Sequence, residues 1–301
     1  MAGYDVNSLT KYVEENKEVL IKDIVLGSDE GGNVIPMLSK QLGIKTSERL
    51  HPLKVSAELQ EATSCGFTPK GSTVISERVL ETGQFKVNDE YCPEDLLGKF
   101  AEYKVRVGAN EGELPFEAEI TNELVESINE QMEKNIWQSR KDEGGIIDGF
   151  IYKAQTDGET IRATYAAGTS AYEAIKVALK NIPEDIIDKA VIFVSPAMFR
   201  EYLQDLVAAN LYHYDPANGA NDEFYIPGSN VKVKKASGMK GRTEIYATAP
   251  ENMVYGADMI DNKEEVKVWF SNDADLYRVK VRFNAGVQTI FPDLVVLVEK
   301  A

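Results

Sequence analysis

Apolar side chains recur every three to four residues between positions 114 and 141, and this spacing predicts one long helix. The stripe consists of Phe116, Ile120, Leu124, Val125, Ile128, Met132, Ile136 and Trp137. Pro115 suits the first turn, and Gly144 with Gly145 is expected to end a helix over residues 115–141. At about 1.5 Å per residue such a helix is roughly 40 Å long, so we expect it to lie across a sheet.

The first 50 residues have weaker periodicity and no self-sufficient core. Asn7 and Ser8 predict the start of a helix carrying Leu9, Val13 and Leu20, and residues 35–44 predict a second one. We interpret residues 1–50 as an arm that needs another surface to pack on. An ordinary amino-terminal subdomain is the alternative.

Residues 51–91 alternate between apolar and polar positions, as strands do. The two strands flank a segment rich in Gly and Pro at 63–71, which predicts a hairpin with a long tip. An isolated hairpin is marginal in water, so either the same chain covers it or it reaches a neighbour. A strand over 84–88 and a short helix opened by Pro93 follow.

From residue 144 the pattern becomes α/β. Ser170 and Glu173 form a capping box before a helix, and residues 190–194 form a continuous apolar run typical of a strand buried on both faces. Ser195 and Pro196 predict another helix start. The residues expected on its inner face are Phe199, Tyr202, Leu203, Leu206 and Val207. A loop over 211–227 and strands over 230–235, 243–248 and 252–256 complete the region.

The carboxyl-terminal segment predicts strands over 265–270, 276–283, 287–291 and 294–298. In the second of these, Tyr277, Val279, Val281 and Phe283 face one way, and Arg278, Lys280 and Arg282 face the other. The long helix laid over such strands predicts an elongated second domain.

Composition narrows the classes of function. The 301 residues are 43% apolar with a net charge of −16, which excludes full disorder and disfavours tight nucleic-acid binding. No signal peptide and no apolar run of membrane-spanning length are visible. Cys65 and Cys92 are the only cysteines, and two free thiols are favoured over a pair.

No catalytic, cofactor-binding or metal-binding residues are predicted. Ser195 lacks a nucleophile motif and suits a helix cap, and His51 and His213 lack a catalytic context. The acidic loops at 215–222 and 272–275 lack calcium-loop spacing, and the Gly pairs at 31–32 and 144–145 match no phosphate loop. The basic cluster could meet an acidic patch of a neighbour or, less favoured, DNA. It consists of Lys232, Lys234, Lys235, Lys240 and Arg242.

Three segments carry a family resemblance. Residues 190–203 are the buried strand and following helix, residues 250–258 read Asn, two apolar residues, Tyr, Gly, x, Asp from Asn252 onward, and residues 277–293 are the third segment. In this order, over roughly residues 110–301, they resemble the major capsid protein of tailed bacteriophages, the Hong Kong 97 type. The stretch 114–138 also resembles capsid proteins of phages from gut Bacteroidetes.

The resemblance implies an α+β fold with an amino-terminal arm (1–50) and an extended hairpin loop (51–92). It also implies a peripheral domain with a spine helix and β-ribbon (93–143 and 260–284) and an α/β axial domain (144–259 and 285–301). The implied function is a non-enzymatic structural subunit, assembled in the host bacterial cytoplasm into pentamers and hexamers of a virion capsid. That shell would enclose double-stranded DNA without sequence-specific binding or a membrane. Arg278, Lys280 and Arg282 would face either its lumen or a neighbouring subunit.

The implied partners are neighbouring capsomers, a portal, and decoration proteins or a separate scaffolding protein. An encapsulin-type compartment shell is the alternative with the same fold. A soluble α/β enzyme is the third hypothesis, and it lacks a convergent set of acid, base and nucleophile.

Overall fold

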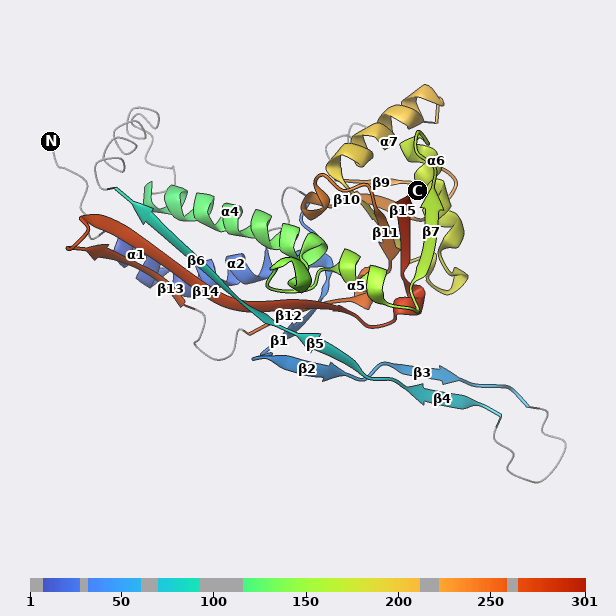
Figure 1. Ribbon diagram of the computed structural model, residues 1–301, viewed down its shortest axis with the longest axis horizontal. Helices are drawn as coiled ribbons and strands as arrows, with labels where there is room; N and C mark the ends of the chain where they lie inside the picture. Colours follow the sequence, from blue (N-terminus) through green and yellow to red (C-terminus); the bar gives the residue numbers. More distant parts are fainter. Residues whose placement is uncertain (1–7, 28–31, 61–69, 93–115, 212–221, 259–264) are drawn as a thin grey trace.

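The computed structural model describes residues 8–27, 32–60, 70–92, 116–211, 222–258 and 265–301. It consists of an elongated part, a compact α/β part and a projecting ribbon (Figure 1). The elongated part contains a five-stranded sheet, and the compact part contains a six-stranded one.

The five-stranded sheet is organised around β14 (Leu276–Thr289). This strand pairs along its first half with β13 (Glu265–Ser271) and with β6 (Gly83–Tyr91), and along its second half with β12 (Met253–Ala257). β1 (Ser39–Leu42) adds a parallel edge to β12. The prediction of separate strands over 276–283 and 287–291 was therefore wrong. β6 pairs with Asn284 and Ala285, and β12 pairs with Ala285 and Gly286, so the intervening residues stay extended.

Helix α4 (Phe116–Gln138) is the predicted long helix, and it lies over this sheet (Figure 1). The stripe residues Ile128, Met132, Ile136 and Trp137 are buried in one core with the inward side chains of β14. The helix ends at Gln138, earlier than predicted. A 3-10 turn, η2 (Lys141–Glu143), follows, and Gly144 adopts a left-handed conformation at φ 88°. The Gly149 N–H donates to the Ser139 carbonyl, which folds the chain back beside the helix end.

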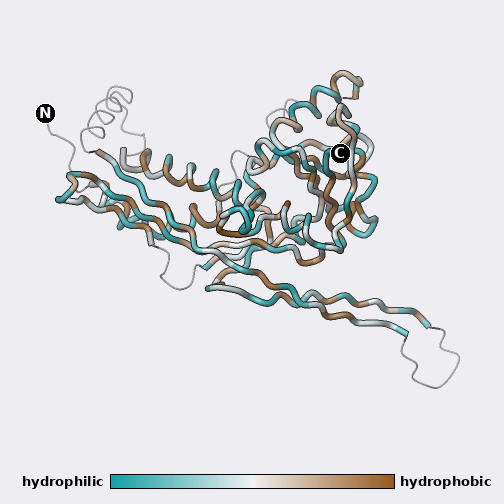
Figure 2. The backbone as a smooth tube through the Cα atoms, viewed as in Figure 1, coloured by the Kyte–Doolittle hydropathy of each residue, from teal (hydrophilic) through white to brown (hydrophobic). Residues whose placement is uncertain are grey.

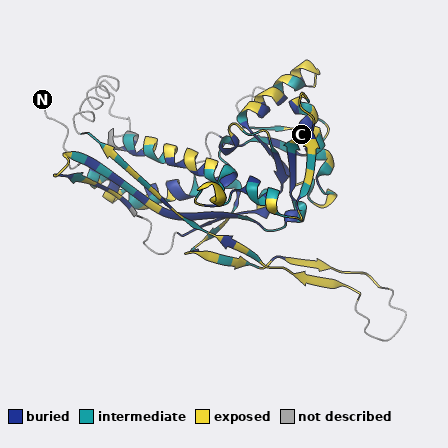
Figure 3. Cartoon of the chain, in the orientation of Figure 1, coloured by how far each residue is buried: buried dark blue, intermediate teal, exposed yellow. Residues whose placement is uncertain are grey.

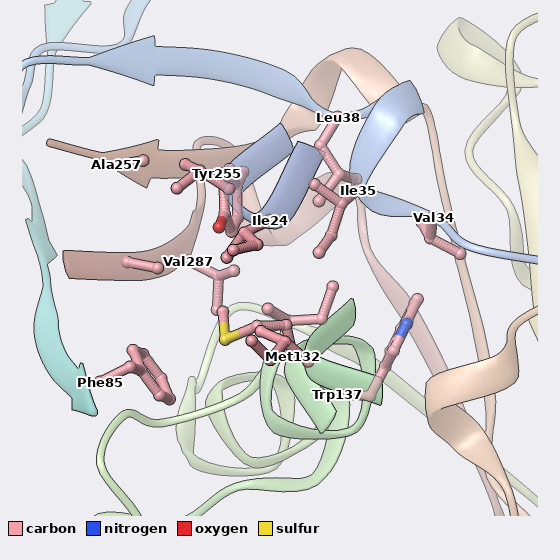
Figure 4. Packing of buried hydrophobic residues seen from close by; sticks show 14 of the residues in the cluster. Ile24, Val34, Ile35, Leu38, Phe85, Met132, Trp137, Tyr255, Ala257 and Val287 are labelled. Carbon is pink, nitrogen blue, oxygen red and sulfur yellow. The ribbon is translucent and has the colours of Figure 1, made fainter. Parts of the chain in front are cut away.

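The amino-terminal segment packs on its own chain. Helices α1 (Ser8–Glu15) and α2 (Lys17–Leu26) bury Leu9, Val13 and Leu20 in the core shared by α4 and the sheet. The same chain therefore supplies the surface that residues 1–50 were expected to need, in the groove between α4 and β13. Figure 4 shows Ile24, Val34, Ile35 and Leu38 gathered beside Met132 and Trp137.

The predicted helix over residues 35–44 was also wrong. Only η1 (Ile35–Met37) is helical, and β1 follows it as a strand. The parallel register of Ser39 with Val254 shows that pairing with β12 overrides a weak helical pattern.

The six-stranded sheet has the order β7-β15-β11-β8-β10-β9. Its strands are β7 (Ile161–Tyr165), β8 (Val191–Val194), β9 (Glu223–Tyr225), β10 (Lys232–Lys235), β11 (Ile245–Thr248) and β15 (Val296–Lys300). Strand β9 lies inside the stretch predicted as a loop. It forms because its backbone pairs with β10.

The central strand β8 is buried on both faces, as predicted. Ile192 and Val194 face the core with α6 (Ala171–Asn181) and α7 (Pro196–Ala208), whereas Val191 and Phe193 face the core with α4 and α5 (Phe150–Thr156). The remaining short helical turns are η3 (Glu184–Ile186), η4 (Ser237–Met239), η5 (Pro250–Asn252) and η6 (Pro292–Leu294). Val207 of α7 is 60% exposed, so its predicted inward position was wrong.

The projecting ribbon is the predicted hairpin. It consists of β2 (Ser47–Leu50) paired with β5 (Arg78–Glu81), and β3 (Leu53–Ser56) paired with β4 (Ser72–Ile75). Its outer half extends away from both sheets (Figure 1). Figure 3 shows this half as exposed, and Figure 2 shows that apolar residues occur along it. The tip and the short helix predicted after Pro93 lie outside the described residues.

Candidate assembly surface

The outer half of the hairpin holds large apolar side chains in solvent. Leu53 pairs with Ile75 across the two strands, and Val55 lies two residues from Leu53, so all three share one face. Their side chains are 54%, 67% and 63% exposed, in that order. We call them the apolar hairpin face. Since no described part of the same chain buries this face and an isolated hairpin is marginal in water, it is a candidate contact surface for another molecule.

The base of the hairpin is fixed on the five-stranded sheet, on the side opposite the helices. Leu80 and Ile44 pack with Val254 in a small separate core. Close approach of the backbones permits this contact, because a Cβ atom on Gly286 would lie 2.1 Å from the Glu81 carbonyl oxygen. The outer half therefore projects from a seated base.

Ion pairs add to the seating of the base. Arg78 lies 2.5 Å from Asp157 and 3.4 Å from Glu159, and Lys141 lies 2.6 Å from Glu81. Further out, Lys54 pairs with Asp293. These pairs join the ribbon to segments more than 50 positions away in the sequence, and sequence reasoning missed them because no local pattern marks them.

The pKa values of these groups follow from their neighbours. The hydrogen bond and charge of Lys141 lower the pKa of Glu81. Burial opposes ionisation of Asp157, but the hydrogen bonds from Arg78 and the Glu159 backbone outweigh it and lower its pKa. Burial lowers the pKa of Lys153, in α5, to about 8, although Asp148 and Glu81 oppose this shift.

The residues weighed for nucleophilic or acid–base chemistry occupy structural positions. The Ser195 hydroxyl is 2% exposed and accepts the Met198 N–H at 3.4 Å, which confirms the predicted cap of α7. His51 is exposed, and His213 lies outside the described residues. Cys92 is a free thiol, and Cys65 falls outside the described part of the chain.

The loops weighed for cations and anions show no built site. Residues 272–275 form an exposed turn, and of the loop at 215–222 only Asp222 is described. Among the described residues, no three His, Cys, Asp or Glu side chains lie close enough together to hold a metal ion. Gly144 ends the segment after α4 by its left-handed conformation, which accounts for that glycine. Gly31 of the other pair is not among the described residues.

The predicted basic cluster is paired largely within the chain. The ion pairs are Lys232 with Glu223 (2.7 Å), Lys235 with Asp222 (2.5 Å), Arg242 with Glu244 (3.1 Å) and Lys240 with Glu130 (3.9 Å). These carboxylates come from β9 and the residue before it, from α4 and from the residue before β11, so the fold itself supplies acidic partners for the cluster.

The alternation predicted for β14 is confirmed. Arg278, Lys280 and Arg282 lie on the sheet face opposite the helices, and Arg278 donates to Glu90 at 3.0 Å. Lys86 and Lys267 lie on the same face by register.

Within the described residues, no helix is long and apolar enough to cross a membrane.

Comparison with known proteins places the fold. No protein-family model matches the sequence, and no curated protein matches it either. Solved structures do match. A chain from the procapsid of satellite phage P4, which includes the size determination (Sid) protein, aligns at 11% identity over 95% of this chain and 91% of its own, with a TM-score of 0.63.

Two further matches come from other particles. A chain from the native GTA particle capsid gives a TM-score of 0.60 at 10% identity, covering 91% of this chain and 92% of that one. The virus-like particle from Pyrococcus furiosus gives 0.52 at 11% identity, covering 95% and 98%. At these identities the likeness concerns the fold, which is the mixed helix-and-sheet fold of phage capsid proteins.

Proposed function

We propose that this chain is a major capsid protein, a non-enzymatic subunit whose copies form pentamers and hexamers of an icosahedral virion shell around double-stranded DNA. The apolar hairpin face carries the proposal. A fold shared with particle-forming chains presents Leu53, Val55 and Ile75 on a ribbon that its described residues do not cover. Burial of that face on a neighbouring copy would stabilise both the hairpin and the shell.

The proposed parts of the subunit are those predicted from the sequence, although β2 of the arm segment lies in the ribbon and β6 of the loop segment lies in the five-stranded sheet. Residues 1–50 are the arm, 51–92 the extended loop, 93–143 and 260–284 the peripheral domain with spine helix α4, and 144–259 and 285–301 the axial domain. The predicted boundary between residues 284 and 285 falls inside β14, and β12 pairs with the axial part of that strand, so the two domains would share one continuous strand. Such continuity would keep the subunit rigid when copies of it pack into a shell.

The proposal includes assembly in the host bacterial cytoplasm with a portal and with scaffolding or decoration proteins. The net charge of −16 supports enclosure of DNA without sequence-specific binding, because neutralising many phosphates requires clustered Lys and Arg. Only the likeness of residues 114–138 supports a phage of gut Bacteroidetes as the source.

An encapsulin-type compartment shell is the second candidate, and one observation favours it. Encapsulins begin with a helix that forms the cargo-docking site, and α1 and α2 lie against the spine helix here. Neighbouring genes separate the two candidates. Portal and terminase genes support the capsid, whereas a peroxidase-like or ferritin-like gene supports the compartment.

Electron microscopy of the purified protein tests the shell. Closed particles are expected under suitable assembly conditions, and monomers or dimers under every condition would contradict a shell of either kind.

Deleting residues 64–71 should leave the α/β domain folded, as seen by circular dichroism, and should block closed shells.

A further inference from the structure

Glu133 is a completely buried carboxyl group in the centre of the molecule. It lies on α4 between Met132 and Trp137, and its side chain is 0% exposed. Its neighbours in this core are apolar, and a buried carboxylate is costly without partners. Sequence reasoning passed over it, although an acid beside a helical apolar stripe is itself a signal.

The carboxyl group of Glu133 binds the backbone of the arm. One oxygen, Oε1, accepts the backbone N–H of Val34 at 2.6 Å and of Ile35 at 2.8 Å. These two N–H groups lie where η1 begins, and the two arm residues are buried beside α4 (Figure 4). The other oxygen, Oε2, is buried and accepts no hydrogen bond of good geometry, although the Trp137 side chain lies close enough to lower the pKa of the group. The site therefore supplies two backbone donors to Oε1 and no donor of good geometry to Oε2.

The groups around the site come from four elements. β10 presents Lys234, whose charge favours ionisation of Glu133. Nearby, the pair of Lys235 with Asp222 lies against Gly32 of the arm, and Lys240, which follows η4, pairs at the rim with Glu130 of α4. α2 contributes the Asp23 backbone carbonyl, which accepts from Asn129.

Among these influences, burial has the largest effect on the pKa of Glu133. It raises the pKa of Glu133 to about 7, although the Ile35 and Val34 N–H groups, Lys234 and Trp137 lower it. When the arm leaves, water reaches the carboxyl group and its pKa returns toward the ordinary value of 4.5. The docked state therefore binds a proton more tightly than the undocked state does.

We propose that Glu133 is a proton-operated latch, so that docking of arm residues 32–38 onto α4 takes up one proton on its carboxyl group. Docking is strongest when the group is protonated. It weakens as the pH rises from 4.5 to 7, by up to tenfold in the docking equilibrium per pH unit, and levels off above 7. The latch involves contacts within one chain. A failed test of the latch therefore leaves the proposed shell function untouched, and a failed test of the shell leaves the latch untouched.

Hydrogen exchange of the full-length protein tests the latch. The measured quantity is the protection of peptides covering residues 32–38, corrected for intrinsic exchange, from pH 5 to pH 8. Protection should fall between pH 5 and 7 and flatten above 7, while α6 peptides show no such slope. Glu133→Gln keeps an acceptor for the two N–H groups and should remove the slope.

Glu130→Gln is the matched control, because this exposed acid is one turn away on the same helix, and it should keep the wild-type slope. A slope retained in Glu133→Gln overturns the proposal, as does a flat wild-type profile between pH 5 and 7. If Glu133→Gln does not fold, a Trp269→Phe protein reports through Trp137 alone, one turn from Glu133. Its emission should titrate with a midpoint near pH 7, and constant emission overturns the latch.

Discussion

The guanidinium group of Arg78 lies 2.5 Å from a carboxylate oxygen of Asp157, and both side chains are only about one-fifth exposed, at 22% and 20%. This pair ties the base of the hairpin to the segment after α5, 79 positions away in the sequence. The direction in which the ribbon leaves the body therefore depends on a long-range ionic contact as well as on the small core at its base.

Arg78→Ala should lower the free energy of unfolding by about 1–2 kcal/mol at pH 7, between the values for exposed and buried pairs. The pKa of Asp157 is lower in the folded chain than its ordinary 3.8, so the pair stabilises above pH 3.8 and is lost as the pH falls through the folded value. Urea denaturation at pH 7 and at pH 3 measures both effects. Arg49→Ala, which breaks a more exposed pair on the same ribbon, is the control. An equal loss at both pH values would assign the effect to packing.

Trp137→Ala should destabilise the protein by about 3–5 kcal/mol, because it removes a large side chain from a filled core. The indole ring lies 5.4 Å from the rings of Phe193 and Tyr246 and 5.6 Å from that of Phe150, and so joins α4 to the six-stranded sheet. Thermal unfolding followed by calorimetry measures the loss. Trp269→Ala is the control, since this tryptophan is 40% exposed, and its effect should be much smaller. Similar losses for the two variants would contradict the role of Trp137.

Gly238→Ala should cost about 1–3 kcal/mol through overpacking. A Cβ atom at this position would lie 2.1 Å from the Glu133 carbonyl oxygen, so η4 and α4 would have to separate. The melting temperature reports the change. Gly158→Ala provides a matched control, because its Cβ atom would meet nothing within 4 Å. An unchanged melting temperature in Gly238→Ala would show that η4 and α4 can separate without loss of stability.

Ile75→Asp should leave the subunit folded and block closed particles. The side chain is 67% exposed, so the new charge costs little in one chain, but it would be desolvated if the apolar hairpin face is buried on a neighbour. Circular dichroism checks the fold, and negative-stain microscopy counts particles. Val74→Asp, on the opposite face of the same strand and 58% exposed, should assemble better. Normal particles from Ile75→Asp would refute the contact.

The sequence alone indicated many of the elements. The spacing of Ile128, Met132 and Ile136 predicted the long helix, and the run Val191–Val194 predicted a strand buried on both faces. Both are local signals, because the period and length of an apolar run depend only on nearby residues. The cap of α7 at Ser195 was predictable for the same reason.

Other features depended on partners distant in the sequence. β1 is a strand because β12 offers it a backbone to pair with, and β14 continues through Ala285 because strands flank it on both sides. The arm folds onto its own chain because α4 and β13 leave an apolar groove for Leu9 and Val13. A local pattern shows that a segment has an apolar face but does not show which surface will bury it.

The sequence by itself determined the periods, the caps, the acidic charge and the absence of a recognisable catalytic motif, since each is written in neighbouring residues. The tertiary structure decided which apolar faces were buried and which stayed open. It placed the carboxyl group of Glu133 in the buried core, matched the basic cluster with acids from other elements, and left the apolar hairpin face exposed. The physical reason is that burial and charge pairing are properties of the space around a side chain, and distant parts of the chain fill that space.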